Sequence, residues 1–296
     1  MELRVLHYFL AVAREGSISA AAASLHLSQP TLSTQLRQME EELGKQLLIR
    51  GTRGSRRVEL TDEGRIVRRR AEEILALVHK MEGEVALSDD AIEGDVYIGA
   101  GESDTVRLLV HAARQLGTRY PGIRYHIASG NADFVIDRLD KGLIDLGLVY
   151  TDIDPMKYQS LLLPAHDRMG VLMRRDDPLA DRPAVEPQDL WDRRLILSQQ
   201  REYSPLLSRW MKRSMDRLQV VASYNLVYNA SLLVDEGFGI ALCLDKLIHT
   251  AGSPLCFRPL DPPLELCPRL VWKRYQVFSK ATETFLEQLQ QMFGQG

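Results

Sequence analysis

The 296-residue sequence predicts an α/β protein whose first part is helical apart from one short hairpin. Up to about position 85, apolar residues recur at the three- and four-residue spacing of amphipathic helices. From about position 95, short apolar runs alternate with helical patterns, which indicates parallel strands with helices on the faces of the sheets. The length suits two or three domains. With 45% hydrophobic and 26% charged residues, the composition is that of an ordinary globular chain.

The bulk properties exclude several protein classes. A net charge of -3 argues against a polyanion binder by overall charge, although arginines concentrate between residues 50 and 70. Three cysteines without CxxC spacing argue against a disulfide framework and fit a reducing compartment. His7, Arg14 and Glu15 interrupt and follow the first apolar run, so we reject a signal peptide. We therefore expect a cytoplasmic protein with no membrane partner, no metal and no cofactor.

The first two predicted helices are short. Residues 3–14 predict an amphipathic helix that ends at Gly16, and Ser19 is expected to cap a second helix over residues 20–25. The expected inward side of the first helix consists of Leu3, Leu6, Leu10 and Ala13.

A third helix is predicted from Ser28 to about Leu43, before Gly44. Ser28 suits the N-cap, and Pro30 falls in the first turn, where its missing N–H costs nothing. Helical spacing predicts that the core-facing residues are Leu32, Leu36, Met39 and Leu43. The opposite face is small and polar, and comprises Gln29, Pro30, Thr31, Ser33, Thr34 and Arg37.

Residues 47–60 place two apolar ends around a Gly/Arg tip and predict a β-hairpin, with four arginines projecting from it: Arg50, Arg53, Arg56 and Arg57. Helix, short helix, turn, helix and hairpin is the layout of a winged helix-turn-helix DNA-binding domain. Gln suits adenine and Arg suits guanine, so the polar face of the third helix is expected to contact base edges of double-stranded DNA. All four hairpin arginines are expected at phosphates, and Arg53 at the tip is also a candidate for the minor groove. Arg65 and Arg68 to Arg70 are candidates to extend this basic surface. The alternative is a structural helix beside a solvated basic face.

Thr61 is expected to cap a long helix whose apolar residues are spaced 4, 3, 4, 3 and 4. These residues are Val67, Ala71, Ile74, Val78, Met81 and Val85. The regular spacing favours a dimerisation seam, and the alternative is a helix packed on its own domain. Residues 88–95 are polar and are expected to form a linker.

The motifs that carry a family resemblance follow one another along the whole chain. They are "SISAAAASLHLSQPTLSTQLRQMEEELGKQLLIR", "VELTDEGR", "RYPGIRYHIASG", "DRLDKGLIDLGLV", "LLVDEGFGIAL" and "RLVWKR". In their order and spacing, the sequence resembles LysR-type transcriptional regulators. The resemblance implies a winged helix-turn-helix, a dimerising linker helix and a two-lobed, periplasmic-binding-protein-like effector domain. It also implies a homodimer or dimer of dimers controlled by a small-molecule effector, with RNA polymerase as a candidate partner.

The expected domain boundaries follow from these segments. They are 1–60 for the DNA-binding domain, 61–89 for the linker helix, 94–161 and 266–296 for the first lobe, and 162–265 for the second lobe. The effector is expected in the crevice between the lobes. By resemblance, its contacts are Gly101, Ser103, Asp104, Gly130, Asn131, Ala132, Gln200, Arg201, Tyr203 and Tyr228.

One alternative to direct effector contact stays open, and one electrostatic argument bears on the charge of the effector. Ser103 and Asp104 have the chemistry of helix caps. The turn Gly101-Glu102-Ser103-Asp104 departs from the family pattern, and its acidic residues would oppose a carboxylate ligand, which Arg201 and His166 could offset.

Enzymatic signatures are absent from the sequence. "GAGESD" begins like a dinucleotide fingerprint, but Asp104 replaces its third glycine, and no GxSxG, P-loop or HExxH motif occurs. We expect no enzyme. The competing hypothesis is a solute-binding or enzymatic α/β protein whose first module docks partners.

Overall fold

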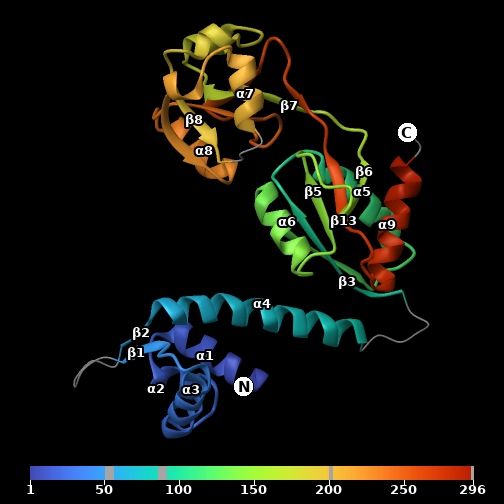
Figure 1. Cartoon of the computed structure of the whole chain (residues 1–296). Helices are drawn as coiled ribbons and strands as arrows, with labels where there is room; N and C mark the ends of the chain where they lie inside the picture. The colour runs from blue at the N-terminus through green and yellow to red at the C-terminus, as the bar shows by residue number, and fades with distance from the viewer. Residues whose placement is uncertain (51–56, 86–91, 200–202, 295–296) are drawn as a thin grey trace. The chain divides into compact units, whose positions relative to one another are not determined.

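A computed structural model describes residues 1–50, 57–85, 92–199 and 203–294 of the chain (Figure 1). It divides the protein into two compact units, Met1–Ala86 and Leu87–Gly296. The first half of the predicted linker, residues 88–91, lies outside the described residues, and its predicted end is wrong because the first strand of the second unit already begins at Gly94. No helix among the described residues is long and apolar enough to cross a bilayer.

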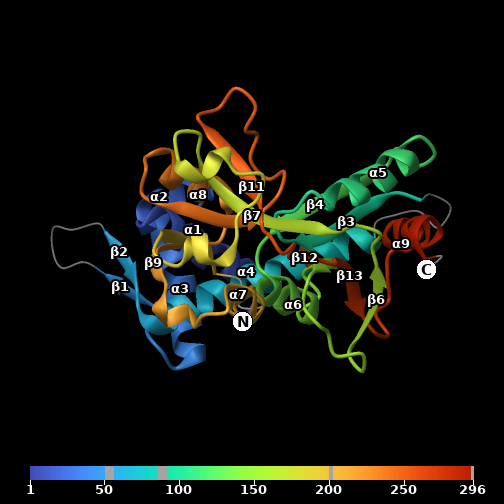
Figure 2. The ribbon, with the colours of Figure 1, turned by 90° about the horizontal axis from the view of Figure 1, so that it is seen from above.

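The first unit is helical with one small hairpin. Its elements are α1 (Leu3–Glu15), α2 (Ile18–Ser24), α3 (Gln29–Leu43), β1 (Leu48–Arg50), β2 (Val58–Leu60) and α4 (Asp62–Val85). The antiparallel strands β1 and β2 lie side by side (Figure 2). Phe9, Leu32 and Leu36 are fully buried and form the centre of the core that the helices share.

Two details of the first helices differ from the prediction. The buried residues of α1 are Val5, Leu6, Phe9, Ala11 and Val12. Of the predicted inward side, Leu3 is 47% exposed, and Leu10 and Ala13 are half-buried. The helix is apolar around most of its circumference, so its pattern does not define one inward side. The buried side is the one centred on the large Phe9 ring, not the one that the sequence predicted. The cap of α2 is Ser17 rather than Ser19, because Ser17 Oγ accepts from Ala20 N–H at 3.3 Å.

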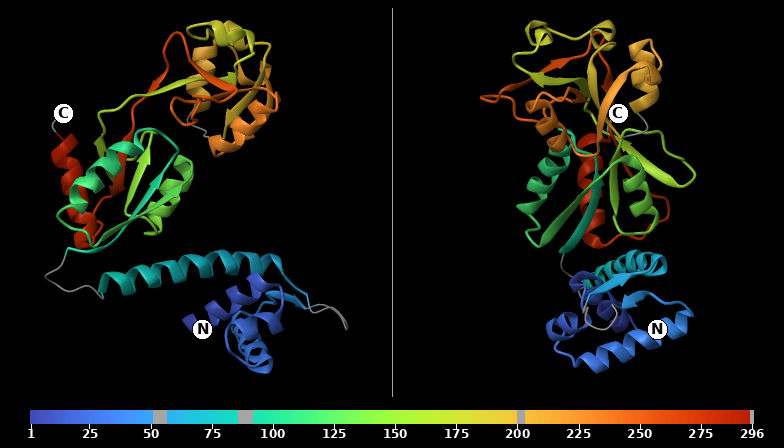
Figure 3. Two further views of the ribbon diagram at one scale, coloured as in Figure 1. Left: turned by 180° about the vertical axis from the view of Figure 1, so that it is seen from behind. Right: turned by 90° about the vertical axis from the view of Figure 1, so that its left-hand side faces the viewer.

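The second unit is a two-lobed α/β structure. The first lobe contains β3 (Gly94–Ala100), α5 (Val106–Gly117), β4 (Ile123–Ser129), α6 (Ala132–Asp140), β5 (Leu146–Val149), β6 (Tyr158–Leu162), β13 (Arg269–Lys273) and α9 (Lys280–Phe293). Its strands follow the order β4-β3-β5-β13-β6 among the described residues. The helices α5 and α9 pack on one face of this sheet and α6 on the other (Figures 1 and 3).

The second lobe has a similar construction. It contains β7 (Asp167–Arg174), β8 (Arg194–Ser198), α7 (Tyr203–Met211), β9 (Gln219–Tyr224), α8 (Val227–Asp235), β10 (Ile240–Leu244), β11 (Leu255–Pro259), β12 (Glu265–Leu266) and short 3₁₀ turns at Pro178–Asp181, Pro187–Leu190 and Met215–Arg217. The described strands follow the order β11-β7-β10-β8-β9, with β12 paired to β7. The helices α7 and α8 pack on separate apolar clusters.

The sheets are mixed rather than purely parallel. Neighbours within the strand–helix units are parallel, as expected, but β13 pairs antiparallel with β5 and β6, and β7 pairs antiparallel with β10 and β11. The antiparallel strands β6, β7 and β13 flank the two points at which the chain passes from one lobe to the other. Close helix–sheet packing in the first lobe depends on Gly147, since a Cβ there would lie 2.5 Å from Val135 Cγ1 on α6.

Candidate functional site

The N-terminal turn of α3 is capped as the sequence predicts. Ser28 Oγ accepts from Thr31 N–H at 3.2 Å, and Pro30 occupies the first turn. Leu32, Leu36 and Met39 are buried at 2% exposure or less. Leu43 is 42% exposed, contrary to the prediction, because the chain turns at Gly44 and brings Leu47 and Leu48 into the core instead.

The outward face of α3 carries the predicted polar residues. Gln29, Pro30, Thr31, Thr34 and Arg37 are exposed and Ser33 is half-buried. Two hydroxyls are oriented by local bonds: Thr34 Oγ1 donates to Pro30 O at 2.9 Å, and the Ser28 and Thr31 hydroxyls lie 2.7 Å apart. The side chains of Gln29 and Arg37 make no hydrogen bond or ion pair among the described residues. The longest polar side chains of this face are therefore available to a ligand.

Glu40 has a structural role that the sequence did not reveal. Its Oε1 accepts from Leu47 N–H at 2.8 Å and Leu48 N–H at 3.0 Å, and its Oε2 accepts from Arg50 Nη2 at 3.0 Å. Its side chain is 15% exposed, so it lies at the base of the hairpin rather than on the outer surface. Arg50 is correspondingly half-buried and paired, and its predicted phosphate contact would have to coexist with this ion pair.

The remaining basic residues are exposed and largely balanced. Arg57 lies 3.6 Å from Glu59 on β2, and three arginines of α4 pair with acidic neighbours on the same helix: Arg65 with Asp62, Arg68 with Glu72, and Arg70 with Glu73. Arg53 and Arg56 lie outside the described residues. The proposed minor-groove contact of Arg53 therefore stays a prediction.

The predicted seam of α4 divides into two parts. Val67 and Ala71 pack into the core of their own unit, where α1 lies along the first half of α4 (Figures 1 and 3). This part follows the alternative of a helix packed on its own domain. Further along α4 the apolar residues are exposed: Ile74 and Leu77 at 38%, Met81 at 55% and Val85 at 79%, with Val78 half-buried. Leu77 was missing from the predicted seam.

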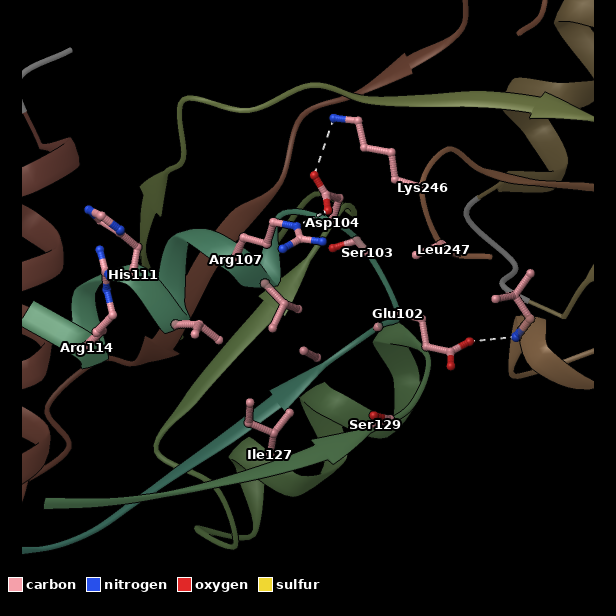
Figure 4. A pocket seen from close by; sticks show the side chains of 15 residues that line it. Glu102, Ser103, Asp104, Arg107, His111, Arg114, Ile127, Ser129, Lys246 and Leu247 are labelled. Atoms are coloured by element: carbon pink, nitrogen blue, oxygen red, sulfur yellow. Dashed lines mark hydrogen bonds and ion pairs between the residues drawn. The ribbon is translucent and has the colours of Figure 1, made fainter. Parts of the chain in front are cut away.

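In the second unit, a hollow of about 630 Å³ contains several predicted effector residues (Figure 4). Gly101, Ser103 and Asp104 line it from the loop between β3 and α5, and the second lobe contributes Val227, Lys246 and Leu247. The prediction missed these three contributors. Lys246 and Leu247 follow β10 in a turn whose sequence carries no recognisable motif.

Ser103 and Asp104 do not cap α5. Thr105 is the N-cap residue and its side chain makes no capping bond. Asp104 instead accepts from Arg107 Nε and lies 3.4 Å from Lys246 Nζ, so these cations, Arg107 first, hold the pKa of the Asp104 carboxyl below its usual value. Ser103 is 8% exposed, and its Oγ has no hydrogen-bond partner among the described residues.

Glu102 connects the two lobes. Its Oε2 accepts from the Val227 amide at the start of α8 at 2.6 Å. A second connection is formed by the buried Asp167 on β7, whose Oδ2 accepts from the hydroxyls of Thr105 and Tyr150, each at 2.5 Å. Asp167 was not predicted, and a single Asp before an apolar strand carries no distinctive signal.

The other predicted effector residues lie elsewhere or outside the described part. Asn131 caps α6, with Oδ1 accepting from Phe134 N–H at 3.0 Å, and neither Gly130 nor Ala132 lines the hollow. Tyr228 on α8 is 65% exposed. Gln200, Arg201 and the side chain of Tyr203 lie outside the described residues. His166 is exposed beside Cys267 and Glu265.

Comparison with known families decides what these two units are. Residues 3–65 match the model of the bacterial regulatory helix-turn-helix proteins of the lysR family, and residues 89–294 match the LysR substrate binding domain. The chain belongs to the LysR family. It is therefore a LysR-type DNA-binding transcriptional regulator with an effector-binding domain.

Relatives and solved structures of this family resemble the chain from end to end. The transcriptional regulator BudR of Raoultella terrigena is 29% identical over 97% of this chain and 99% of its own length. The uncharacterized regulator YvbU of Bacillus subtilis (strain 168) is 26% identical over 99% of both chains. Full-length BenM matches with a TM-score of 0.54 and 27% identity over 99% of this chain and 97% of its own. CbnR shares the fold, with a TM-score of 0.77 and 19% identity over 99% of both chains.

Proposed function

We propose that this LysR-family protein reads operator DNA with the exposed polar face of α3. The observation that carries the proposal is the capped, small-residue face in the first half of that helix, where the Gln29 and Arg37 side chains have no bonding partner within the part of the chain that the structure describes. Gln can pair with adenine and Arg with guanine in the major groove. The small side chains of Pro30, Thr31, Ser33 and Thr34 allow close approach to the bases. CbnR, which shares the fold, has been solved with its target DNA.

The supporting contacts to DNA come from the hairpin. Arg53 is proposed for the minor groove and Arg50, anchored by Glu40, for a phosphate near the base of the hairpin. Glu41 and Glu42 are exposed on the last turn of α3 and would repel phosphates. This charge limits base contacts to the first half of the helix.

The DNA proposal is tested by fluorescence anisotropy with the region upstream of the protein's own gene. Replacing Gln29 and Arg37 together by alanine should weaken specific binding by roughly 2–6 kcal/mol, since each bidentate base contact contributes about 1–3 kcal/mol. Weak, salt-sensitive binding to unrelated DNA should remain. The matched control is Arg4→Ala, because Arg4 is an exposed arginine of α1 that pairs with Glu2. Unchanged operator affinity in the double variant would contradict the assignment.

The effector is proposed to bind at the hollow between the lobes. The support is the convergence of Gly101, Ser103 and Asp104 with Val227 and Lys246, together with the unsatisfied hydroxyl of Ser103. A buried hydroxyl without a partner is costly, and a bound ligand can supply the missing hydrogen bond. We propose that the protein acts by binding rather than catalysis and works in the cytoplasm, as the regulator names of its relatives suggest.

The second half of α4 is proposed as the homodimer surface. Ile74, Leu77, Met81 and Val85 form an exposed apolar stripe, which a second copy of the helix would bury. Leu77→Asp with Met81→Asp should convert the dimer to monomers in light scattering. The same double substitution at the polar positions Glu72 and His79 should leave the dimer intact. A dimer that survives the first pair of substitutions would rule out this stripe.

A further inference from the structure

The Glu102 carboxylate occupies a position that an anionic ligand would otherwise favour. The first amides of a helix attract negative charge, and α8 presents its first amide, that of Val227, to the hollow. Glu102 Oε2 accepts from this amide at 2.6 Å across the boundary between the lobes (Figure 4). The protein therefore supplies its own carboxylate to the N-terminus of α8.

Within the described part of the chain, Glu102 has no cationic partner of the kind that its neighbour Asp104 has. Asp104 in the same hollow lies against Arg107 and Lys246. No Lys, Arg or His nitrogen among the described residues lies within ion-pair distance of Glu102. The contact with the Val227 amide uses one of its two carboxylate oxygens. The other oxygen, Oε1, is an acceptor of high charge density held in place by the first.

A second residue of the hollow, Ser103, carries a polar atom without a hydrogen-bond partner among the described residues. Ser103 is more than nine-tenths buried, and the atom without a partner is its Oγ. A hollow that contains an unbalanced carboxylate and an unsatisfied hydroxyl matches a ligand that carries several hydrogen-bond donors and a positive charge.

We propose that Glu102 sets the chemical class of the effector: the hollow binds a small molecule through a protonated amine or guanidinium group. That group donates to Glu102 Oε1, and a separate polar group of the ligand reaches Ser103 Oγ. Glu102 also excludes carboxylates, because it already occupies the Val227 amide and repels a second negative charge. The inference rests on the proposal that this hollow is the effector site.

The test uses two probes of equal carbon number and opposite charge, putrescine and succinate, measured by calorimetry and thermal shift on the full chain. Wild type should bind putrescine at millimolar concentration and should not bind succinate.

Glu102→Gln keeps an acceptor for the Val227 amide but loses the charge, and should weaken putrescine binding at least tenfold. Glu102→Ala empties the N-terminus of α8 and should admit succinate. Glu287→Gln, an exposed residue of α9, is the matched control and should behave like wild type.

Three results would overturn the proposal: succinate binding to wild type as tightly as putrescine, equal putrescine affinity in wild type and Glu102→Gln, or no putrescine binding to wild type. Operator binding by each variant is measured in parallel. Retained operator binding with any of these results would reject the ligand class and leave the regulator assignment standing. Loss of operator binding in wild type would instead reject the DNA-reading proposal.

Discussion

The outward face of α3 and the hollow between the lobes are formed in different ways. The α3 face comes from nine consecutive residues on one capped helix, from Gln29 to Arg37, and its orientation follows from three buried side chains on the opposite side. The hollow is assembled from segments that are more than a hundred residues apart, such as Glu102 and Val227. A surface on one helix therefore depends on local patterning, whereas a hollow between lobes depends on tertiary contacts.

The largest effect is expected for the core that orients the outward face of α3. The question is whether this core is stable independently of the second unit. Leu36 is 1% exposed in that core, so Leu36→Ala should lower the unfolding free energy of the first unit by roughly 2–5 kcal/mol. The second unit has separate cores and should keep its melting temperature. Leu43→Ala, the same substitution at a 42% exposed position of the same helix, should have little effect. Calorimetry that shows both units destabilised by Leu36→Ala would contradict the independence of the two cores.

A smaller effect concerns the link between α3 and the hairpin. Glu40→Ala removes the acceptor of two backbone N–H groups and the partner of Arg50, and should cost about 1–3 kcal/mol. Glu41→Ala is the matched control, because Glu41 is exposed and its side chain makes no bond among the described residues. Chemical denaturation of the first unit distinguishes the two. Equal stability of both variants would mean that the Glu40 contacts contribute nothing net.

The smallest effect lies in the second unit and depends on pH. Asp95 on β3 accepts from Arg124 at 2.8 and 2.9 Å and from His126 Nε2 at 2.7 Å, and these bonds, Arg124 first, hold the pKa of Asp95 well below its ordinary 3.8. A lowered folded-state pKa stabilises the fold above the unfolded-state pKa, and this stabilisation is lost as the pH falls below it.

We therefore expect Asp95→Asn to lower stability by about 0.5–1 kcal/mol at pH 7, and this difference from wild type to shrink below about pH 4. Urea unfolding at several pH values measures it. The control is Asp152→Asn, at an exposed position of the same lobe. A difference that grows on acidification would contradict the sign of the pKa shift.

The sequence was sufficient for features that depend on local patterning. Ser28, Pro30 and Gly44 bound α3 as expected, Thr61 Oγ1 accepts from Gly64 N–H at the start of α4, and alternating strand and helix patterns predicted both lobes. Each of these features needs residues within a few positions of one another. The family itself was recognised from motifs distributed over both units.

Tertiary contacts decided the features that were mispredicted. The strands β6 and β11 were not predicted, since both lie at sheet edges and are defined by pairing with β13 and β7. Leu43 was expected inside, but residues beyond the helix fill that part of the core. The first half of the α4 seam packs on α1, which periodicity alone could not distinguish from a seam that binds a second copy.

The same limitation affected the candidate site. Asn131 has the residue type of a ligand contact, yet its side-chain oxygen Oδ1 caps α6. Glu102 could be suspected from its charge in a turn, but its partner Val227 is identified only by the fold. The predicted contacts at Gln200 and Arg201 lie outside the described residues and stay predictions.

The Glu40 contacts have a consequence for the choice of DNA sequence. Since Glu40 belongs to α3 and binds Leu47, Leu48 and Arg50, the helix proposed to enter one groove is held at a fixed separation from the strands proposed to approach the neighbouring groove. Duplexes vary in groove width and stiffness with base composition. A fixed separation of this kind would favour operators whose flanking base pairs adopt the matching groove width at low elastic cost. Base pairs that no side chain touches would then contribute to promoter selection.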